Sequence, residues 1–206
     1  LNTNPTEFIE SPKKLTPITV QTFLTPEQVA LMREKLIERG DTQLRLYATL
    51  SLSTMARLNA IASLRWTQVD TQNCIIHDVL EKEGKIVDLY FNEEVKLLFE
   101  ELRSQRERSG KSDNGWVFYS GRTTPTRHIN NGTLNAWCKE IGQMIGVPTL
   151  HPHDFRHSGA TLLKNAGMSL EDVSVLLNHE STDTTKKFYI KQDIRRISSV
   201  KNRYNI

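Results

Sequence analysis

One short stretch with strand character, set between long stretches of helical periodicity, limits what this 206-residue chain can fold into. From Trp66 to Tyr90, β-branched and aromatic residues alternate with polar ones, and a charged turn, LEKEGK, divides them into the runs CIIHDV and KIVDLYF. Two such runs joined by a short turn predict an antiparallel hairpin with lysines at its tip. With helices on both sides, we expect a mainly α domain with a small antiparallel β-sheet, an α+β fold class.

The helices are predicted from their end signals and apolar spacing. Thr25 followed by Pro26 marks a helix start, and Gly40 ends that helix. WVFYS, residues 116–120, is predicted to be a short buried strand. Further helices are predicted over about 42–55, 57–64, 93–108, 128–145, 153–166, 169–177 and 182–190.

Composition excludes several classes of protein. The sequence has no apolar run near the roughly 18 residues of a membrane span and no charged-then-apolar leader, so we expect a soluble protein in the cytoplasm. Its two cysteines, Cys74 and Cys138, are too few and too far apart for a disulfide framework or a thiolate zinc site. A start at Leu1 rather than Met suggests a piece of a longer protein. We expect a linker or arm over 1–23, one domain over 24–190 and a tail over 191–206.

Positive charge is concentrated near the end of the chain. Residues 1–150 hold 18 Lys and Arg against 18 Asp and Glu, whereas residues 151–206 hold 9 against 6. Four of the six histidines also lie in this last segment. The segment is therefore compatible with a polyanionic partner, although the excess is too small to establish one by itself.

The densest group of polar residues lies in HPHDFRHSGATLLKNAG. A helix from Pro152 would place His153, Arg156 and His157 on one face and turn Leu162, Leu163 and Ala166 inward. Asp154 is the only acidic residue nearby, so a bound anion would relieve the repulsion among these groups. A zinc hydrolase is the alternative for the histidines, but Arg156 stands where such motifs have an aspartate, and a cation there repels a metal.

Several boxes in the same order resemble the signature of tyrosine recombinases, the phage integrase family. The match covers about residues 24–190 and leaves out the separate N-terminal DNA-clamping domain that such proteins usually carry. The boxes are HDFRHSGAT from His153, NAG from Asn165, VLLNH ending at His179, TTKKFY ending at Tyr189, TMARLNAIASLRWTQVD around Arg57, and the turn KEGK from Lys82.

The resemblance implies cleavage and rejoining of double-stranded DNA through a 3′-phosphotyrosyl intermediate, without a metal or other cofactor. Two guanidiniums, Arg57 and Arg156, would hold the phosphate charge, and Tyr189 would attack the phosphorus. Lys82 would protonate the leaving 5′-oxygen, with Lys85 as the alternative. His153 would act as general base or orient the tyrosine, and His179 would donate a hydrogen bond to the phosphate.

The chain departs from the family pattern at four positions. The family often has Gly at Met55, an acidic residue at Ala60 and Gly at Asn178, so we expect another group to orient Arg57. The spacing from His179 to Tyr189 is one residue longer than usual, which places Phe188 at the usual tyrosine. Either the helix is shifted by one residue and Tyr189 is the nucleophile, or Phe188 marks a substituted nucleophile.

The resemblance also implies a homotetramer on DNA and a phage or mobile-element origin. For the tail over 191–206 two arrangements stay open, exchange between protomers or a helix that folds back on its own domain. A DNA-binding domain of the same fold that no longer cleaves is the alternative.

Overall fold

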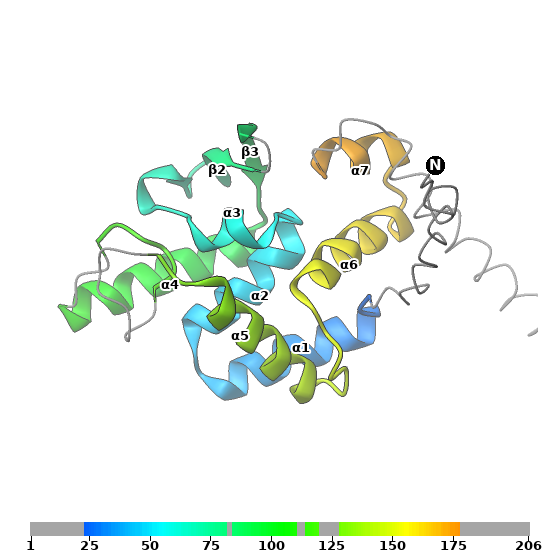
Figure 1. Ribbon diagram of the computed structural model, residues 1–206, viewed down its shortest axis with the longest axis horizontal. Helices are drawn as coiled ribbons and strands as arrows, with labels where there is room; N and C mark the ends of the chain where they lie inside the picture. Colours follow the sequence, from blue (N-terminus) through cyan, green and yellow to red (C-terminus); the bar gives the residue numbers. More distant parts are fainter. Residues whose placement is uncertain (1–22, 82–83, 111–113, 120–127, 178–206) are drawn as a thin grey trace, which may run out of the picture.

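The computed structural model describes residues 23–81, 84–110, 114–119 and 128–177, and there the chain forms helices around one small sheet (Figure 1). The hairpin and α7 stand on the same side of the molecule, above α2, α3 and α6 (Figure 1). The elements are α1 (Pro26–Arg39), α2 (Thr42–Thr54), α3 (Leu58–Ala62), a 3₁₀ turn (Trp66–Gln68), β1 (Val69–Asp70), β2 (Ile75–Leu80), β3 (Ile86–Tyr90), α4 (Glu93–Ser109), α5 (Asn131–Met144), α6 (Pro152–Asn165) and α7 (Leu170–Leu176).

The predicted fold class is confirmed, and the end signals act as expected. The Thr25 hydroxyl accepts a hydrogen bond from the Gln28 amide at 3.2 Å, and the Gln28 side chain accepts one from the Thr25 amide at 2.9 Å. Gly40 ends α1 with φ +69°, a conformation in which a residue with a Cβ is strained. The predicted helix over 182–190 and the segments 1–22 and 178–206 lie outside the described residues.

The strand predicted at 116–120 is wrong. Trp116 forms a single bridge with Arg65, and the Val117 amide donates to the Leu64 carbonyl at 2.9 Å. No second strand among the described residues extends this pairing into a ladder. Val117 and Phe118 are buried because they pack into the core, and their burial produced the strand-like pattern.

The sheet has the order β1-β2-β3 and is antiparallel throughout. Its register shifts between Ile76 and Val79, where Asp78 has φ +52°, so one extra residue bulges out of β2. Ile76 and Val79 are both buried although they are three residues apart, and Leu80 is 60% exposed. The bulge therefore changes which side chains of the hairpin face the core.

Helix α2 is the centre of the core and contacts α1, α3, α4, α6 and β3. Its Tyr47 ring lies edge-on to the rings of Phe118 and Phe155, with centroid distances of 6.4 and 6.0 Å. Burial raises the pKa of Tyr47 well above its usual value, so this tyrosine stays neutral and structural.

Helix α6 lies unusually close to the last turn of α2. A Cβ on Gly159 would stand 2.3 Å from the Leu52 carbonyl oxygen and 2.7 Å from Cγ of Met55, so only glycine permits this approach. The neighbouring Ser158 hydroxyl accepts a hydrogen bond from the Leu24 amide at 2.8 Å. The close approach at Gly159 holds α6 against the end of α2, and the hydrogen bond from Leu24 ties α6 to the segment that precedes α1.

No helix among the described residues is both long and apolar enough to cross a membrane.

Candidate active site

The turn after α2 brings Arg57 to the surface beside α6. Met55 ends α2 with φ +55°, a left-handed conformation that glycine adopts more easily, and its side chain is buried against Ala160, Val173 and Leu177. Arg57 then stands in an extended conformation directly before α3, as its N-cap residue, without a hydrogen bond from its side chain to that helix. One third of the Arg57 side chain is exposed to solvent.

Arg156, by contrast, is buried under the ends of two helices. Its side chain donates to the Met55 carbonyl at 2.5 Å and to the Leu177 carbonyl at the end of α7. Burial, and then the charge of Arg57, lower the pKa of Arg156 to about 10, against a raising effect of Glu81. The guanidinium therefore stays charged at neutral pH, and the three groups interact electrostatically.

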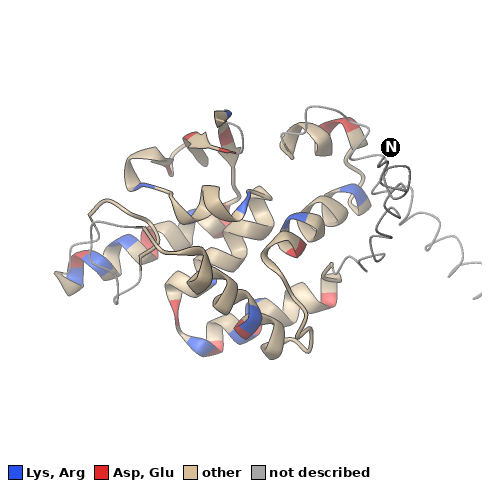
Figure 2. Cartoon of the chain, in the orientation of Figure 1, with Lys and Arg blue, Asp and Glu red and all other residues tan. Residues whose placement is uncertain are grey.

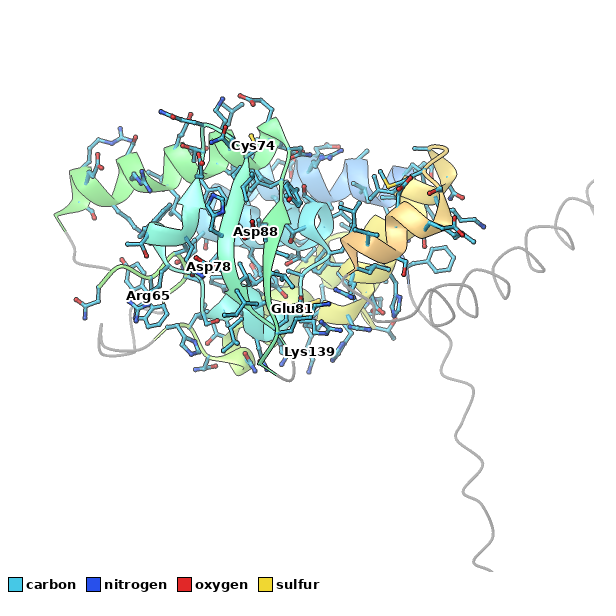
Figure 3. The ribbon with its side chains drawn as sticks, turned by 90° about the horizontal axis from the view of Figure 1, so that it is seen from above. Arg65, Cys74, Asp78, Glu81, Asp88 and Lys139 are labelled. Carbon is cyan, nitrogen blue, oxygen red and sulfur yellow. The ribbon has the colours of Figure 1, made fainter. Side chains whose placement is uncertain are left out.

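Glu81, which follows β2, is the acidic member of this cluster. Its carboxylate Oε2 forms an ion pair with Nη1 of Arg57, and the Glu81 side chain is only 1% exposed. Figure 3 shows Glu81 at the end of the hairpin, farther along the chain than the bulged Asp78. The second oxygen, Oε1, is buried and has no hydrogen-bond partner among the described residues.

Two histidines of α6 border the cluster. The ring of His153 lies edge-on to the ring of His157, with 4.6 Å between centroids. Partial burial, followed by the positive charges of Arg156, His151 and Arg57, lowers the pKa of His153 below its usual 6.5. His153 is therefore neutral at pH 7 and can accept a proton.

Asp154 serves the fold rather than this cluster. Its side chain accepts a hydrogen bond from the His151 amide at 2.7 Å and so caps α6. Burial raises the pKa of Asp154, although the hydrogen bond and the His151 charge oppose the rise. The cap fixes where α6 begins, and thereby the face on which His153 and Arg156 appear.

A separate hollow of about 470 Å³ lies between β3, the end of α2 and α7. Its wall includes the carboxylates of Asp78 and Asp88, which Figure 3 shows on β2 and β3, and the apolar side chains of Val87 and Leu176. Two carboxylates repel an anion, so the hollow does not suit a phosphate. Over α1 and α4, acidic and basic residues are interspersed (Figure 2), and net charge does not single out these surfaces as an anion site either.

The structure thus brings together three of the six predicted site residues, Arg57, His153 and Arg156. The other three, Lys82, His179 and Tyr189, lie outside the described residues, as do Phe188 and Asn178. Lys85, the alternative to Lys82, is exposed, and its carbonyl accepts a hydrogen bond from the Glu81 amide at 2.8 Å.

Sequence reasoning missed Glu81 as a member of the site. The regular alternation of β2 would have placed it outward, and only the bulge at Asp78 turns it toward Arg57. The missing acid at Ala60 was the one available signal, because it left Arg57 in need of a partner.

The zinc alternative is not supported by the arrangement of the histidines. Within the described ranges, no group of three or more His, Cys, Asp and Glu side chains is placed to hold a metal ion. The buried Arg156 charge belongs to the same turns of α6 as His153 and His157 and would repel one.

Comparison with known proteins gives a consistent result. The model of the phage integrase family matches residues 22–196. A tyrosine recombinase XerC from Lactobacillus delbrueckii subsp. bulgaricus is 34% identical over 148 residues, which cover 69% of this chain and 48% of that protein. A tyrosine recombinase XerC from Roseiflexus sp. strain RS-1 is 29% identical over 193 residues, covering 89% and 59%. The chain thus spans about half the length of these curated relatives.

Solved structures show the same fold. The crystal structure of XerA recombinase matches with a TM-score of 0.70 at 23% identity, covering 80% of this chain and 58% of that one. The XerH site-specific recombinase in a post-cleavage complex with a palindromic difH substrate matches with a TM-score of 0.73 at 20% identity, covering 94% and 57%.

Proposed function

Because the chain belongs to the phage integrase family, we propose that it catalyses site-specific recombination of double-stranded DNA. The observation that carries this proposal is the cluster of two guanidiniums, Arg57 and Arg156, with the buried carboxylate of Glu81. Two positive charges and one negative charge leave a surplus of one, which one phosphodiester would neutralise. The structure of the Tn1549 transposon integrase, which shares the fold and is described as a complex with transposon right end DNA, supports the choice of DNA.

In the proposed reaction, Tyr189 is the nucleophile. Its phenolic oxygen forms a bond to the scissile phosphorus while the bond from phosphorus to the 5′-oxygen breaks, which leaves a 3′-phosphotyrosyl link and a free 5′-hydroxyl. The 5′-hydroxyl of a second strand reverses the step and releases the tyrosine. One phosphoester bond replaces another, so no ATP or redox cofactor is needed.

The other residues would handle charge and protons in that step. Arg57 and Arg156 would hold the nonbridging oxygens, where negative charge accumulates in the transition state. Lys82, or Lys85, would protonate the leaving 5′-oxygen. His153, which is neutral at pH 7 because its pKa is lowered, would take the tyrosine proton or orient the tyrosine. His179 would donate a further hydrogen bond to the phosphate.

Trapping on DNA tests the reaction. When the substrate is nicked a few nucleotides 3′ of the cleavage position, cleavage releases the short fragment that carries the free 5′-hydroxyl. Rejoining is then prevented, so the covalent intermediate accumulates and the modified peptide can be mapped. We expect the adduct on Tyr189, and the variant Tyr189→Phe should form none. Binding without any adduct would support the alternative, a DNA-binding domain that no longer cleaves.

Two conditions test the absence of a metal and the role of phosphate contacts. We expect adduct formation to persist in excess EDTA, and binding to weaken steeply with salt as counterions return to the DNA. Activity that is lost in EDTA and restored by added metal would support the hydrolase alternative.

We further propose that the protein acts as a homotetramer on DNA of a phage or mobile element, in the cytoplasm, and that the tail over 191–206 links neighbouring protomers. Ile194, Ile197 and Val200 recur at helical spacing in that tail, which gives it an apolar stripe. Deletion of residues 192–206 should abolish assembly on DNA with two sites while the monomer stays folded. Unchanged assembly would refute the linking role.

A further inference from the structure

We propose that Glu81 is the positioning residue for Arg57, an inference that rests on the function proposed above. The side chain of Arg57 makes no capping bond to α3, and no residue of α3, which runs from Leu58 to Ala62, carries a carboxylate. The ion pair with Glu81 reaches Arg57 instead from the hairpin, 24 residues further along the chain. The group that orients Arg57 thus comes from another element of the fold.

The bulge in β2 delivers this carboxylate. Val79 faces the core and Leu80 faces solvent, so Glu81 faces inward and is 6% exposed as a whole residue. A strand that kept regular alternation from the buried Ile76 would have turned Leu80 inward and Glu81 outward. The extra residue at Asp78 therefore brings a charged side chain to the buried face, at the position directly before the predicted Lys82.

Burial argues against an incidental surface pair. Transfer of a carboxylate out of water costs several kcal/mol, and a single ion pair often does not recover that cost. Glu81 also keeps its oxygen Oε1 buried and unpartnered in the described part of the chain, which makes the site more costly still. Stability alone is a poor explanation for such a group, whereas a need to hold Arg57 in one orientation explains it.

The arrangement leaves Arg57 able to bind a ligand. Glu81 holds Nη1 from the protein side, and one third of the Arg57 side chain stays exposed. Burial and then the charge of Arg57 lower the pKa of Arg156, and the negative charge of Glu81 raises it, so Glu81 favours the charged form of Arg156 beside Arg57. A phosphate can thus approach a guanidinium whose fork already has a fixed direction.

The variant Glu81→Gln tests the proposal, because it removes the charge at nearly constant shape. We expect the rate of covalent adduct formation on nicked DNA to fall by roughly tenfold to a hundredfold, the scale of a misplaced catalytic group. DNA binding should not weaken, since the variant is more positive. Glu81→Asp keeps the buried charge and with it the fold, but its shorter side chain should also slow adduct formation.

The matched control is Glu140→Gln, which removes the carboxylate of a surface ion pair with Arg39, 3.0 Å long in the protein. It should leave the adduct rate unchanged. A double-mutant cycle separates positioning from general stability: with Arg57→Ala already present, Glu81→Gln should slow the reaction less than about twofold further.

Two results would overturn the proposal. In the first, Glu81→Gln and Glu81→Asp both form the adduct at the wild-type rate. In the second, the rate loss of the Arg57→Ala, Glu81→Gln double variant equals the product of the rate losses of the two single variants. A wild-type protein that forms no adduct at all would instead contradict the recombinase function, so the two failures are distinguishable.

Discussion

Replacing Gly159 with alanine should show whether the reaction rate depends on the position of the Arg156 guanidinium, apart from any change in the stability of the fold. The new Cβ would stand 2.3 Å from the Leu52 carbonyl oxygen, and such contacts below 3.0 Å essentially never occur, so α6 must retreat from α2 by at least about 0.7 Å. Overpacking of this kind costs about 1–3 kcal/mol in the free energy of unfolding. Arg156 lies one turn away on α6 and donates to the Met55 carbonyl, so its guanidinium must shift as well.

A displacement near 1 Å can lower a reaction rate by roughly a hundredfold. We therefore expect Gly159→Ala to lose most of its adduct formation on nicked DNA at a temperature where it is still folded. Urea unfolding would give the stability, and gel analysis of the trapped intermediate would give the rate.

Gly142→Ala is the matched control. Its Cβ would stand 2.4 Å from the Val147 carbonyl oxygen and 2.9 Å from Cβ of Leu150, an equally severe clash, but between α5 and the loop that follows it rather than between α2 and α6. It should be destabilised by a similar amount and still react at close to the wild-type rate. If Gly159→Ala keeps as much activity as Gly142→Ala, the close approach of α2 and α6 does not set the position of Arg156.

Three further predictions follow from the same cluster. Arg57→Ala and Arg156→Ala should each slow adduct formation by at least about a hundredfold, and near-normal rates would refute the proposal that these two residues hold the phosphate. Arg156→Lys should also slow the reaction, because an ammonium group cannot reproduce the guanidinium fork that contacts two carbonyls. Met55→Gly relieves about 1 kcal/mol of left-handed strain but loses buried side-chain contacts that cost about 2–5 kcal/mol, so urea unfolding should show a net loss of stability. The pKa of His153 is lowered in the folded protein, so as the pH falls through about 6.5 the unfolded chain binds a proton before the folded protein does, and the free energy of unfolding should decrease. In urea unfolding measured at a series of pH values, His153→Gln should reduce this decrease.

Local signals in the sequence were sufficient for most of the elements. The cap at Thr25, the glycine at Gly40 and the alternation of β2 and β3 each act within a few residues, and the helix and the hairpin that they predict are present. The buried face of α6 was predicted less well. Leu162 and Leu163 are only half buried and Ala166 is exposed, because the contact with α2 is made by small residues such as Gly159.

Pairing between distant segments was beyond the reach of local patterns. WVFYS has strand character but finds a single bridge to Arg65, so its burial and not its pairing explains the pattern. Glu81 became a site residue through a bulge, a one-residue irregularity that alternation does not reveal. The catalytic roles of all six predicted site residues stay predictions, and for Lys82, His179 and Tyr189 so does their position.

The two carbonyl contacts of Arg156 also bear on how such a protein changes over generations. This side chain joins the end of α2 to the end of α7, so selection for a folded protein alone would retain it, even in a lineage that had given up cleavage. Among the described residues, the side chain of Arg57 is held by its ion pair with Glu81 alone, so we expect it to be replaced sooner once activity no longer matters. Loss of the Arg57–Glu81 pair, rather than loss of Arg156, is therefore the earlier mark of a descendant that binds DNA without cutting it.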